Sequence, residues 1–546
     1  MYIHLCKSHL YIIIDCYLSQ KNNMKKIILC VFLLTQTSLM LWAQKTAPEN
    51  WYNLDLKKDK IPGVSTERAY NELLKDKQSN TVIVAVIDGG TEVDHEDLLP
   101  VIWINKGEIP NNNIDDDKNG YLDDVHGWNF IGGKNGDVNE DNLELTRVYK
   151  QLTEKYKGDA QKTGTEYEEY LQIKTDYEKR YSQAQKMTSY FTDLQKGIAD
   201  IQKATGKKNI GIDDLKSYSA KETYQLTSVK LLTIAAKKKV PTASVLAEIS
   251  GAKEYYGKQL STDLNKEINS RNIIGDNYAD VTEKYYGNNH YEGPAGDHGT
   301  HVAGIIAAVR NNGKGMNGVA DNVKIMVVRV VPDGDEHDKD IANGIRYAVD
   351  NGAKIINMSF GKNYSPYKSA VDDAVKYAVS KDVLLVHAAG NDGKNTDTTN
   401  NFPRDVYASN TELASSWIEI GASNWKKGKH ITAEFSNYGK KNVDVFAPGV
   451  DIYSTIPDSK YASFSGTSMA APVTSGVAAM LRSYYPTLTA NQVKEILMQS
   501  SVKVKGKVFL PGADKRKVKM TDLCATGGII NAYEAVKLAD QIVSKK

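Results

Sequence analysis

Runs of branched apolar residues alternate with helical patterns over most of the chain. The clearest run covers residues 81–87, where nearly every side chain is apolar and most are β-branched. A strand without polar alternation is typical of a parallel sheet that is covered by helices on both faces. Similar patterns recur, separated by helical patterns, at residues 323–331, 353–358, 383–387, 417–421 and 443–446. This alternation predicts an α/β fold with a doubly wound, mostly parallel sheet and helices on both of its faces.

Residues 143–270 interrupt the alternation. Gly and Pro become rare there, and apolar residues follow two rows with heptad spacing, which predicts a helix that packs along one seam. The rows are Tyr170, Tyr177, Ala184, Phe191, Ile198 and Ile173, Met187, Leu194, Ile201. Further helices are predicted at 212–239 and 242–269. We interpret 143–270 as an inserted helical segment, a hairpin or small bundle, within an α/β domain formed by 81–142 and 271–546.

Three segments precede the first predicted strand. Residues 24–43 begin with a basic pair and continue as an apolar run, as in a secretory signal peptide. A membrane anchor is disfavoured because polar residues 35–38 interrupt a segment that is already short for a span. Residues 1–23 are not expected in the native product, with Met24 as the preferred start, and residues 44–80 are predicted to form an arm that lies over a domain.

The net charge bears on possible binding partners, and the cysteine content bears on possible disulfide bonds. The formal net charge is +2, and removal of the first 43 residues leaves 65 basic and 66 acidic residues. Nothing in this balance points to nucleic acid or to an anionic membrane. Of the four cysteines only Cys524 lies beyond residue 43, so a mature chain would contain no intramolecular disulfide.

An acidic stretch at residues 115–124 has the spacing of a calcium-binding loop. Oxygen-bearing side chains stand at relative positions 1, 3 and 5, Gly stands at 6, and acids stand at 9 and 10. The Glu expected at position 12 of an EF-hand is missing, so the last ligand would be one of two adjacent aspartates. The candidate ligands are Asp115, Asp117, Asn119, Tyr121 (through its carbonyl oxygen), Asp123 and Asp124. The alternative is a solvated acidic turn without a metal.

Three residues with complementary chemistry stand at predicted strand ends and helix starts. Asp88 follows the first strand, His298 precedes a helical run, and Ser468 precedes another. A serine hydroxyl needs a neighbouring base to act as a nucleophile, and that base needs an acceptor for its other nitrogen. Asn391 follows a buried strand and could stabilise an oxyanion together with the backbone N–H of Ser468. For the small-residue stretch around Ser468 alone, a tightly packed helix start is the alternative.

Four motifs resemble the subtilisin-like serine peptidases, also called subtilases. They are Asp-Gly-Gly at 88–90, HGTHVAG at 298–304, AAGN at 388–391 and GTSMAAP at 466–472. The resemblance implies that Asp88 orients the base, His298 is the general base, Ser468 is the nucleophile and Asn391 is the oxyanion donor. His301 is the rival base, but the family pattern makes it a packed helix residue.

The same resemblance extends to substrate binding. It implies that Ser359, Phe360 and Gly361 pair with an extended substrate backbone, which is a form of β-augmentation. Ala389 and Gly390 would form a wall of the pocket for the residue before the scissile bond, and Asn401 would lie at its floor. No acidic residue falls in that predicted floor, so a strict preference for Lys or Arg is not expected. Gly89 departs from the family, which normally has Thr or Ser there to hold the carboxylate.

These observations predict a secreted serine endopeptidase that is exported to the periplasm or the medium. It would act on polypeptides through an Asp-His-Ser triad and an acyl-enzyme intermediate, with a structural Ca²⁺. We expect no nucleic-acid partner and no stable membrane span after signal removal. Two alternatives stay open. The helical insertion could be a regulatory arm or bind a protein partner, or the chain could be a non-catalytic peptide-binding relative.

Overall fold

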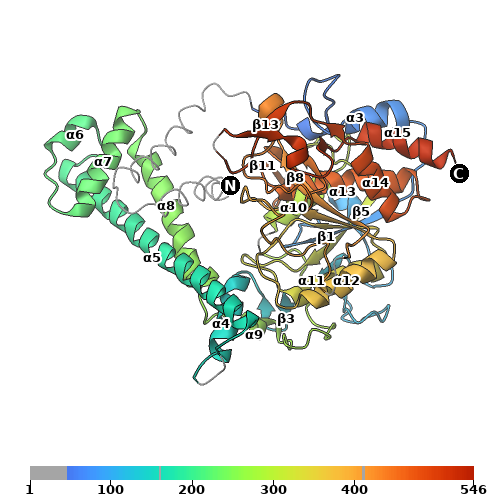
Figure 1. Cartoon of the computed structure of the whole chain (residues 1–546), viewed down its shortest axis with the longest axis horizontal. Coiled ribbons are helices and arrows are strands. Elements are labelled where there is room, and N and C mark those ends of the chain that lie inside the picture. The colour runs from blue at the N-terminus through green and yellow to red at the C-terminus, as the bar shows by residue number, and fades with distance from the viewer. Residues whose placement is uncertain (1–45, 159–161, 295, 409–411, 514, 546) are drawn as a thin grey trace. The chain divides into compact units, whose positions relative to one another are not determined.

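A computed structural model describes residues 46–158, 162–294, 296–408, 412–513 and 515–545. The predictions for residues 1–23 and 24–43 therefore lie outside the described residues. The chain forms two compact units (Figure 1). One is Leu145–Ile268, and the other combines Ala47–Glu144 with Asn269–Lys546. Each unit is described by itself.

The larger unit is built on one sheet, in which the described residues supply nine strands in the order β12-β15-β9-β8-β7-β6-β1-β5-β2. All neighbours are parallel except β12 and β15. The strands are β1 (Val82–Asp88), β2 (Gly127–Asn129), β5 (Val323–Arg329), β6 (Ile355–Met358), β7 (Leu384–Ala388), β8 (Trp417–Ser423), β9 (Val445–Pro448), β12 (Val502–Lys503) and β15 (Gly528–Ile529). The strands predicted from the branched runs are all present, within two residues at each end.

Successive residues of β1 belong to two different cores, because side chains alternate between the faces of a strand. Val84 and Val86 lie in a core with helices α10, α13, α14 and α15, whereas Ala85 and Ile87 lie in a core with α11 and α12. The helices are α10 (Asp297–Ala307), α11 (Asp338–Asp350), α12 (Lys368–Ser380), α13 (Thr467–Tyr484), α14 (Ala490–Gln499) and α15 (Ala532–Val543). Helices thus cover both faces, and the predicted fold class is confirmed.

The N-terminal arm contributes to the first of these cores. Trp51 and Tyr52 are fully buried. The indole N–H of Trp51 donates to the carbonyl oxygen of Val450 over 3.1 Å, and the Tyr52 hydroxyl donates to that of Asn317 over 2.9 Å. Because both polar groups are satisfied, the two large rings can be buried without an unpaired donor.

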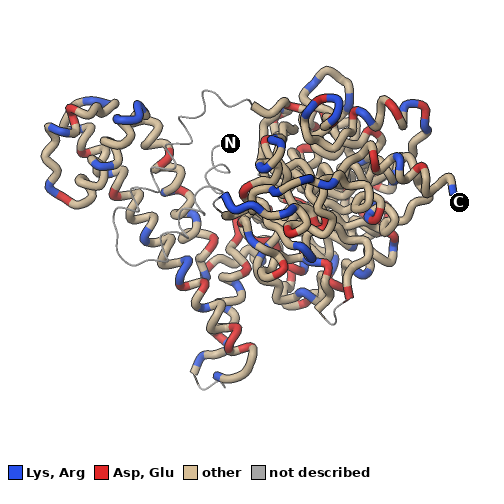
Figure 2. The backbone as a smooth tube through the Cα atoms, turned by 45° about the horizontal axis from the view of Figure 1, so that its top comes forward, with Lys and Arg blue, Asp and Glu red and all other residues tan. Residues whose placement is uncertain are grey.

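The smaller unit consists of helices. They are α4 (Glu144–Lys155), α5 (Thr165–Thr205), α6 (Ile212–Ser217), α7 (Thr223–Lys237) and α8 (Thr242–Lys258). Helix α5 packs against α7 and α8, and both predicted rows of apolar residues are buried on it except for Met187. The helix predicted at 212–239 is broken, because Tyr218 has an extended backbone at the end of α6. Basic and acidic residues are scattered along the helical unit (Figure 2), although α7 contains no acidic residue. No helix among the described residues is long and apolar enough to cross a membrane.

Candidate active site

The predicted catalytic residues stand at strand and helix ends of the larger unit. Asp88 is the last residue of β1, and His298 and Ser468 are the second residues of α10 and α13. Asn391 follows β7 by three residues. In a parallel sheet the carboxyl ends of the strands form one edge, where ligands bind in open α/β folds. Helices α10 and α13 pack against each other, which brings their first turns to this edge.

Asp88 and His298 form a hydrogen-bonded pair. The Nδ1 atom of His298 lies 2.8 Å from Oδ1 of Asp88. Asp88 is 3% exposed, whereas the His298 side chain keeps 29% of its surface in solvent. Burial opposes protonation of His298, but the charge of Asp88 and the hydrogen bond outweigh it and raise the pKa of His298. The carboxylate therefore fixes the proton on Nδ1 and leaves Nε2 as the basic nitrogen.

The Asp88 carboxylate is only partly held. Its Oδ1 accepts a second bond, from the backbone N–H of Gly89 over 2.8 Å, while its buried Oδ2 has no partner among the described residues. Gly89 has no side-chain hydroxyl that could donate to this oxygen. A Cβ at Gly89 would meet only the Val331 carbonyl oxygen, at 3.2 Å, so this neighbour must give way slightly for a larger residue.

Ser468 lies in a network of polar side chains. Its hydroxyl donates to the carbonyl oxygen of Ser359 over 3.0 Å, and the Ser359 hydroxyl donates to the carbonyl oxygen of Ser468 over 2.9 Å. Asn357 donates to the Ser359 hydroxyl over 2.9 Å and accepts from the buried Ser475 over the same distance. The first turn of α13 is thus fixed to the end of β6, while a rotation about the Cα–Cβ bond of Ser468 can redirect its hydroxyl.

Two nitrogen donors surround a space beside Gly466. A Cβ at this residue would lie 3.5 Å from Nδ2 of Asn391 and 3.6 Å from the backbone nitrogen of Ser468. The Asn391 side chain is oriented by its oxygen, which accepts from the backbone N–H of Thr467 over 2.8 Å and from its hydroxyl over 3.0 Å. The amide N–H₂ group is therefore free to donate to a developing oxyanion next to a helix N-terminus.

His301 is a core residue in this structure. It is fully buried, its Nε2 donates to the carbonyl oxygen of Ala462 over 3.1 Å, and its ring stacks on Phe464. Burial lowers the pKa of His301 to about 3, so the ring is neutral at physiological pH. It forms no bond to Asp88, whose Oδ1 is bonded to His298 instead.

The residues predicted to bind substrate lie around Asn401. Its Nδ2 donates to the carbonyl oxygen of Ala388 over 3.0 Å. A Cβ at Gly361 would lie 2.4 Å from Oδ1 of Asn401, and a Cβ at Gly390 would lie 3.7 Å from it. The Asn401 side chain thus lies between Gly361 and Gly390. Ser359 is buried at 3% exposure and Phe360 is half-buried beside it, while Ala389 is fully buried.

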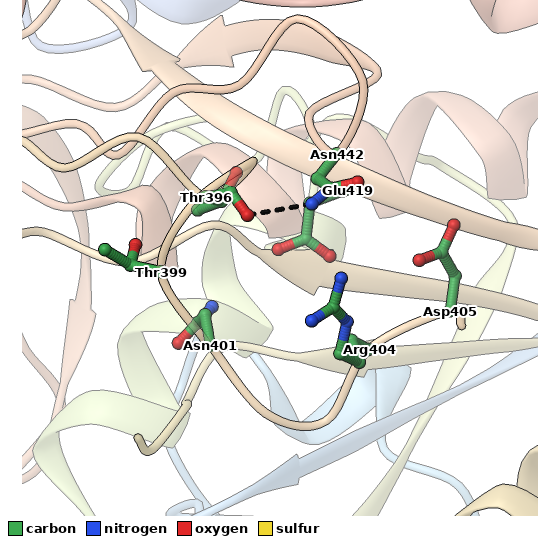
Figure 3. A pocket seen from close by; sticks show the side chains of 7 residues that line it. All are labelled: Thr396, Thr399, Asn401, Arg404, Asp405, Glu419 and Asn442. Atoms are coloured by element: carbon green, nitrogen blue, oxygen red, sulfur yellow. Dashed lines mark hydrogen bonds between the residues drawn. The ribbon is translucent and has the colours of Figure 1, made fainter. Parts of the chain in front are cut away.

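A polar pocket adjoins Asn401 (Figure 3). It is lined by Thr396, Thr399, Asn401, Arg404, Asp405, Glu419 and Asn442. The Arg404 guanidinium points toward the Glu419 carboxylate, and its charge opposes the burial that raises the pKa of Asp405. Two carboxylates, those of Asp405 and Glu419, line this pocket next to Asn401. Glu419 lies on β8, and no sequence motif predicts that it stands beside Asn401 in the fold.

The acidic loop folds around its own carboxylates. Asp115 accepts from the backbone N–H groups of Asn119 and Gly120, and Asp117 accepts from that of Asn119. Carboxylate oxygens of Glu108, Asp115 and Asp117 lie within 4.8 Å of one another. This donor set of oxygens fits a hard cation such as Ca²⁺.

The other predicted ligands have different partners. Asp123 accepts from the backbone N–H groups of Asn112 and Asn113. Asp124 accepts from Asn105, Asn119 and Tyr347, and burial raises its pKa to about 6. The Asn119 side chain directs its nitrogen at Asp117 and its oxygen at the backbone N–H of Tyr121.

A histidine bonded to a buried acid, and a serine beside two nitrogen donors, are groups that serine peptidases use. The sequence model of the subtilase family matches residues 79–523. The chain therefore belongs to the subtilase family and is, at the level of that family, a serine peptidase.

Individual relatives match part of the chain. It is similar to thermitase of Thermoactinomyces vulgaris, with 39% identity over 44% of this chain and 75% of the relative. It is also similar to a thermophilic serine proteinase of Bacillus sp. (strain AK1), with 40% identity over 38% of this chain and 48% of the relative. Subtilisin DY of Bacillus licheniformis is 38% identical over 39% of this chain and 72% of its own length.

Proposed function

We propose that this protein is an exported serine endopeptidase that uses Asp88, His298 and Ser468 as its catalytic triad. The observation that supports this proposal most directly is the space beside Gly466. Asn391 and the backbone of Ser468 both direct donors to it, and the nucleophilic residue stands at its edge. Every helix start leaves backbone N–H groups free, so the group that distinguishes this one is the side-chain amide of Asn391, which its bonds to Thr467 hold beside the same space. The family membership supports the same assignment.

In the proposed reaction His298 Nε2 takes the hydroxyl proton of Ser468 while Oγ bonds to the carbonyl carbon of the substrate. The carbonyl oxygen becomes an oxyanion and accepts from Asn391 Nδ2 and Ser468 N. When the C–N bond breaks, the imidazolium gives its proton to the leaving amine, and an acyl-enzyme remains. A water then attacks the acyl carbon while His298 takes one of its protons. The bond between the acyl carbon and Oγ breaks, and His298 returns the proton to Oγ as the acid leaves. Asp88 stabilises the imidazolium in both halves of the reaction.

Export and calcium binding are part of the proposal. The basic and apolar pattern of residues 24–43 supports a secretory signal. The oxygen-rich cluster around Asp115 and Asp117 supports a structural Ca²⁺, which when bound would neutralise these carboxylates and stabilise the folded state by mass action. No step of the peptidase reaction depends on it.

Covalent labelling with a fluorophosphonate tests the proposal. The reagent should modify the wild-type protein and fail to modify Ser468→Ala. Ser463→Ala is the matched control, since this exposed serine lies on the neighbouring strand β11 (Lys460–Phe464) and should leave labelling unchanged. A folded wild-type protein that is not labelled would contradict the peptidase assignment and favour a peptide-binding relative.

A further inference from the structure

Glu108 is buried and precedes the acidic loop. It was not among the ligands that the spacing of residues 115–124 predicts. It is 7% exposed. Its Oε1 accepts from the backbone N–H groups of Asp116 and Asp117, over 3.1 and 3.2 Å. Its Oε2 is buried and has no hydrogen-bond partner among the residues that the structure describes. A buried carboxylate oxygen without a partner is costly, and a cation bound beside it would offset that cost.

The position of Glu108 indicates where that group would bind. Its carboxylate lies within 4.8 Å of those of Asp115 and Asp117. Calcium binds oxygen at about 2.3–2.6 Å, so two ligands on opposite sides of one ion stand about 5 Å apart. The three carboxylates therefore lie at distances that a single Ca²⁺ can bridge. Without a cation they repel one another.

We propose that Glu108 is the calcium ligand that takes the place of the glutamate missing at position 12 of the loop. Glu108, Asp115 and Asp117 would form the acidic part of the coordination shell. Asp123 and Asp124 would lie outside it, because they are not part of the cluster of carboxylate oxygens that lie within 4.8 Å of one another. This inference rests on the calcium site proposed above and names its ligands; it does not depend on the peptidase activity.

Such a ligand set would connect two turns of the chain. Residues 105–109 and 115–120 would be held by one ion, in addition to the bond from Asn105 to Asp117. The loop also contacts the segment that leads toward α10. Asn289 donates to the carbonyl oxygen of Asp123 over 3.3 Å, and the Tyr121 hydroxyl donates to that of Lys284 over 3.5 Å. Calcium at Glu108 would therefore stabilise residues 284–289 as well as the loop.

Calcium titration of the full chain tests the inference. The protein carries Ser468→Ala so that self-cleavage cannot contribute, and binding is measured by calorimetry. Glu108→Gln should weaken Ca²⁺ binding by about tenfold or more, since it removes a charged ligand. Asp116→Asn is the matched control. It removes the same charge from the loop, but the Asp116 carboxylate binds Ile109 and Asn112 outside the cluster, so we expect less than about a threefold change.

Thermal melting without metal is a second test, in which the effect of Glu108→Gln on the melting temperature should have the opposite sign. In a chelator Glu108→Gln should melt at the same temperature as the parent protein or higher, because the repulsion among three carboxylates is reduced. With Ca²⁺ it should melt lower than the parent. Equal weakening by Glu108→Gln and Asp116→Asn would overturn the assignment of Glu108 as a ligand. A parent protein that binds no Ca²⁺ would overturn the site itself, whatever the labelling of Ser468 shows.

Discussion

Replacement of Asp88 by asparagine removes a charge while leaving the shape of the side chain nearly unchanged. Oδ1 of Asp88 lies 2.8 Å from Nδ1 of His298, and that charge is what raises the pKa of His298 against the effect of burial. In Asp88→Asn the pKa of His298 should therefore fall. The reactive form carries a neutral imidazole, so the acid limb of the activity profile should move to lower pH.

The size of the change in the His298 pKa depends on the distance between the charges of Asp88 and His298. Two unit charges about 4 Å apart interact by about 4 kcal/mol at an effective dielectric constant of about 20, which corresponds to about three pKa units. Solvent reaches 29% of the His298 side chain and screens the interaction. We therefore expect the pKa of His298 to fall, but by less than this unscreened value. The maximal rate should fall by about 10⁴-fold, because asparagine can also stabilise the wrong imidazole tautomer.

The assay is the rate of fluorophosphonate labelling as a function of pH, which needs no knowledge of the natural substrate. Asp94→Asn is the control, since Asp94 is an exposed carboxylate of the segment after β1. Its acid limb and its maximal rate should match those of the wild type. An unchanged acid limb in Asp88→Asn would refute the view that the charge of Asp88 sets the pKa of His298.

Two further predictions concern the oxyanion donor and the N-terminal arm. Asn391→Ala should lower turnover by about a hundred- to a thousandfold, because the loss of one oxyanion donor costs about that much in turnover. A melting temperature close to that of the wild type must show that loss of its bonds to Thr467 has not unfolded the site. Trp51→Ala should lower the free energy of unfolding by about 3–5 kcal/mol in urea titrations, because Trp51 is fully buried. Leu56→Ala, in the same arm but 41% exposed, should change it by less than about 0.5 kcal/mol, and equal losses for both variants would contradict a packed arm.

The parts of the fold and site that the sequence predicts are those encoded locally. A continuous apolar strand ends at Asp88, and helix starts contain His298 and Ser468, so the pattern of each short segment determines where its polar residue stands. The bond between Asp88 and His298 then follows from strand order, since both lie at one edge of a parallel sheet. The backbone is extended at Tyr218, which divides α6 from α7. No Gly or Pro stands there, so the sequence pattern did not predict this break.

Features that depend on two distant segments could not be predicted in this way. Glu108 precedes the loop that it joins, and only folding brings its carboxylate beside Asp115. Likewise Glu419 reaches the pocket beside Asn401 from β8, where the sequence shows only an acid within a buried strand. The spacing of the acidic loop predicts Asp123 as a ligand, but it cannot reveal that backbone N–H groups of an earlier turn bind this carboxylate.

The contacts of the N-terminal arm have a consequence for the order of folding. Val64 accepts a hydrogen bond from the backbone of Ala532, and the hydroxyl of Ser65 accepts one from Asn531. Segments separated by more than 460 residues thus complete one core. Contacts this distant form late, after most of the chain has been synthesised. The cell that makes this peptidase would therefore contain it in an incomplete form until residues 531 and 532 have left the ribosome.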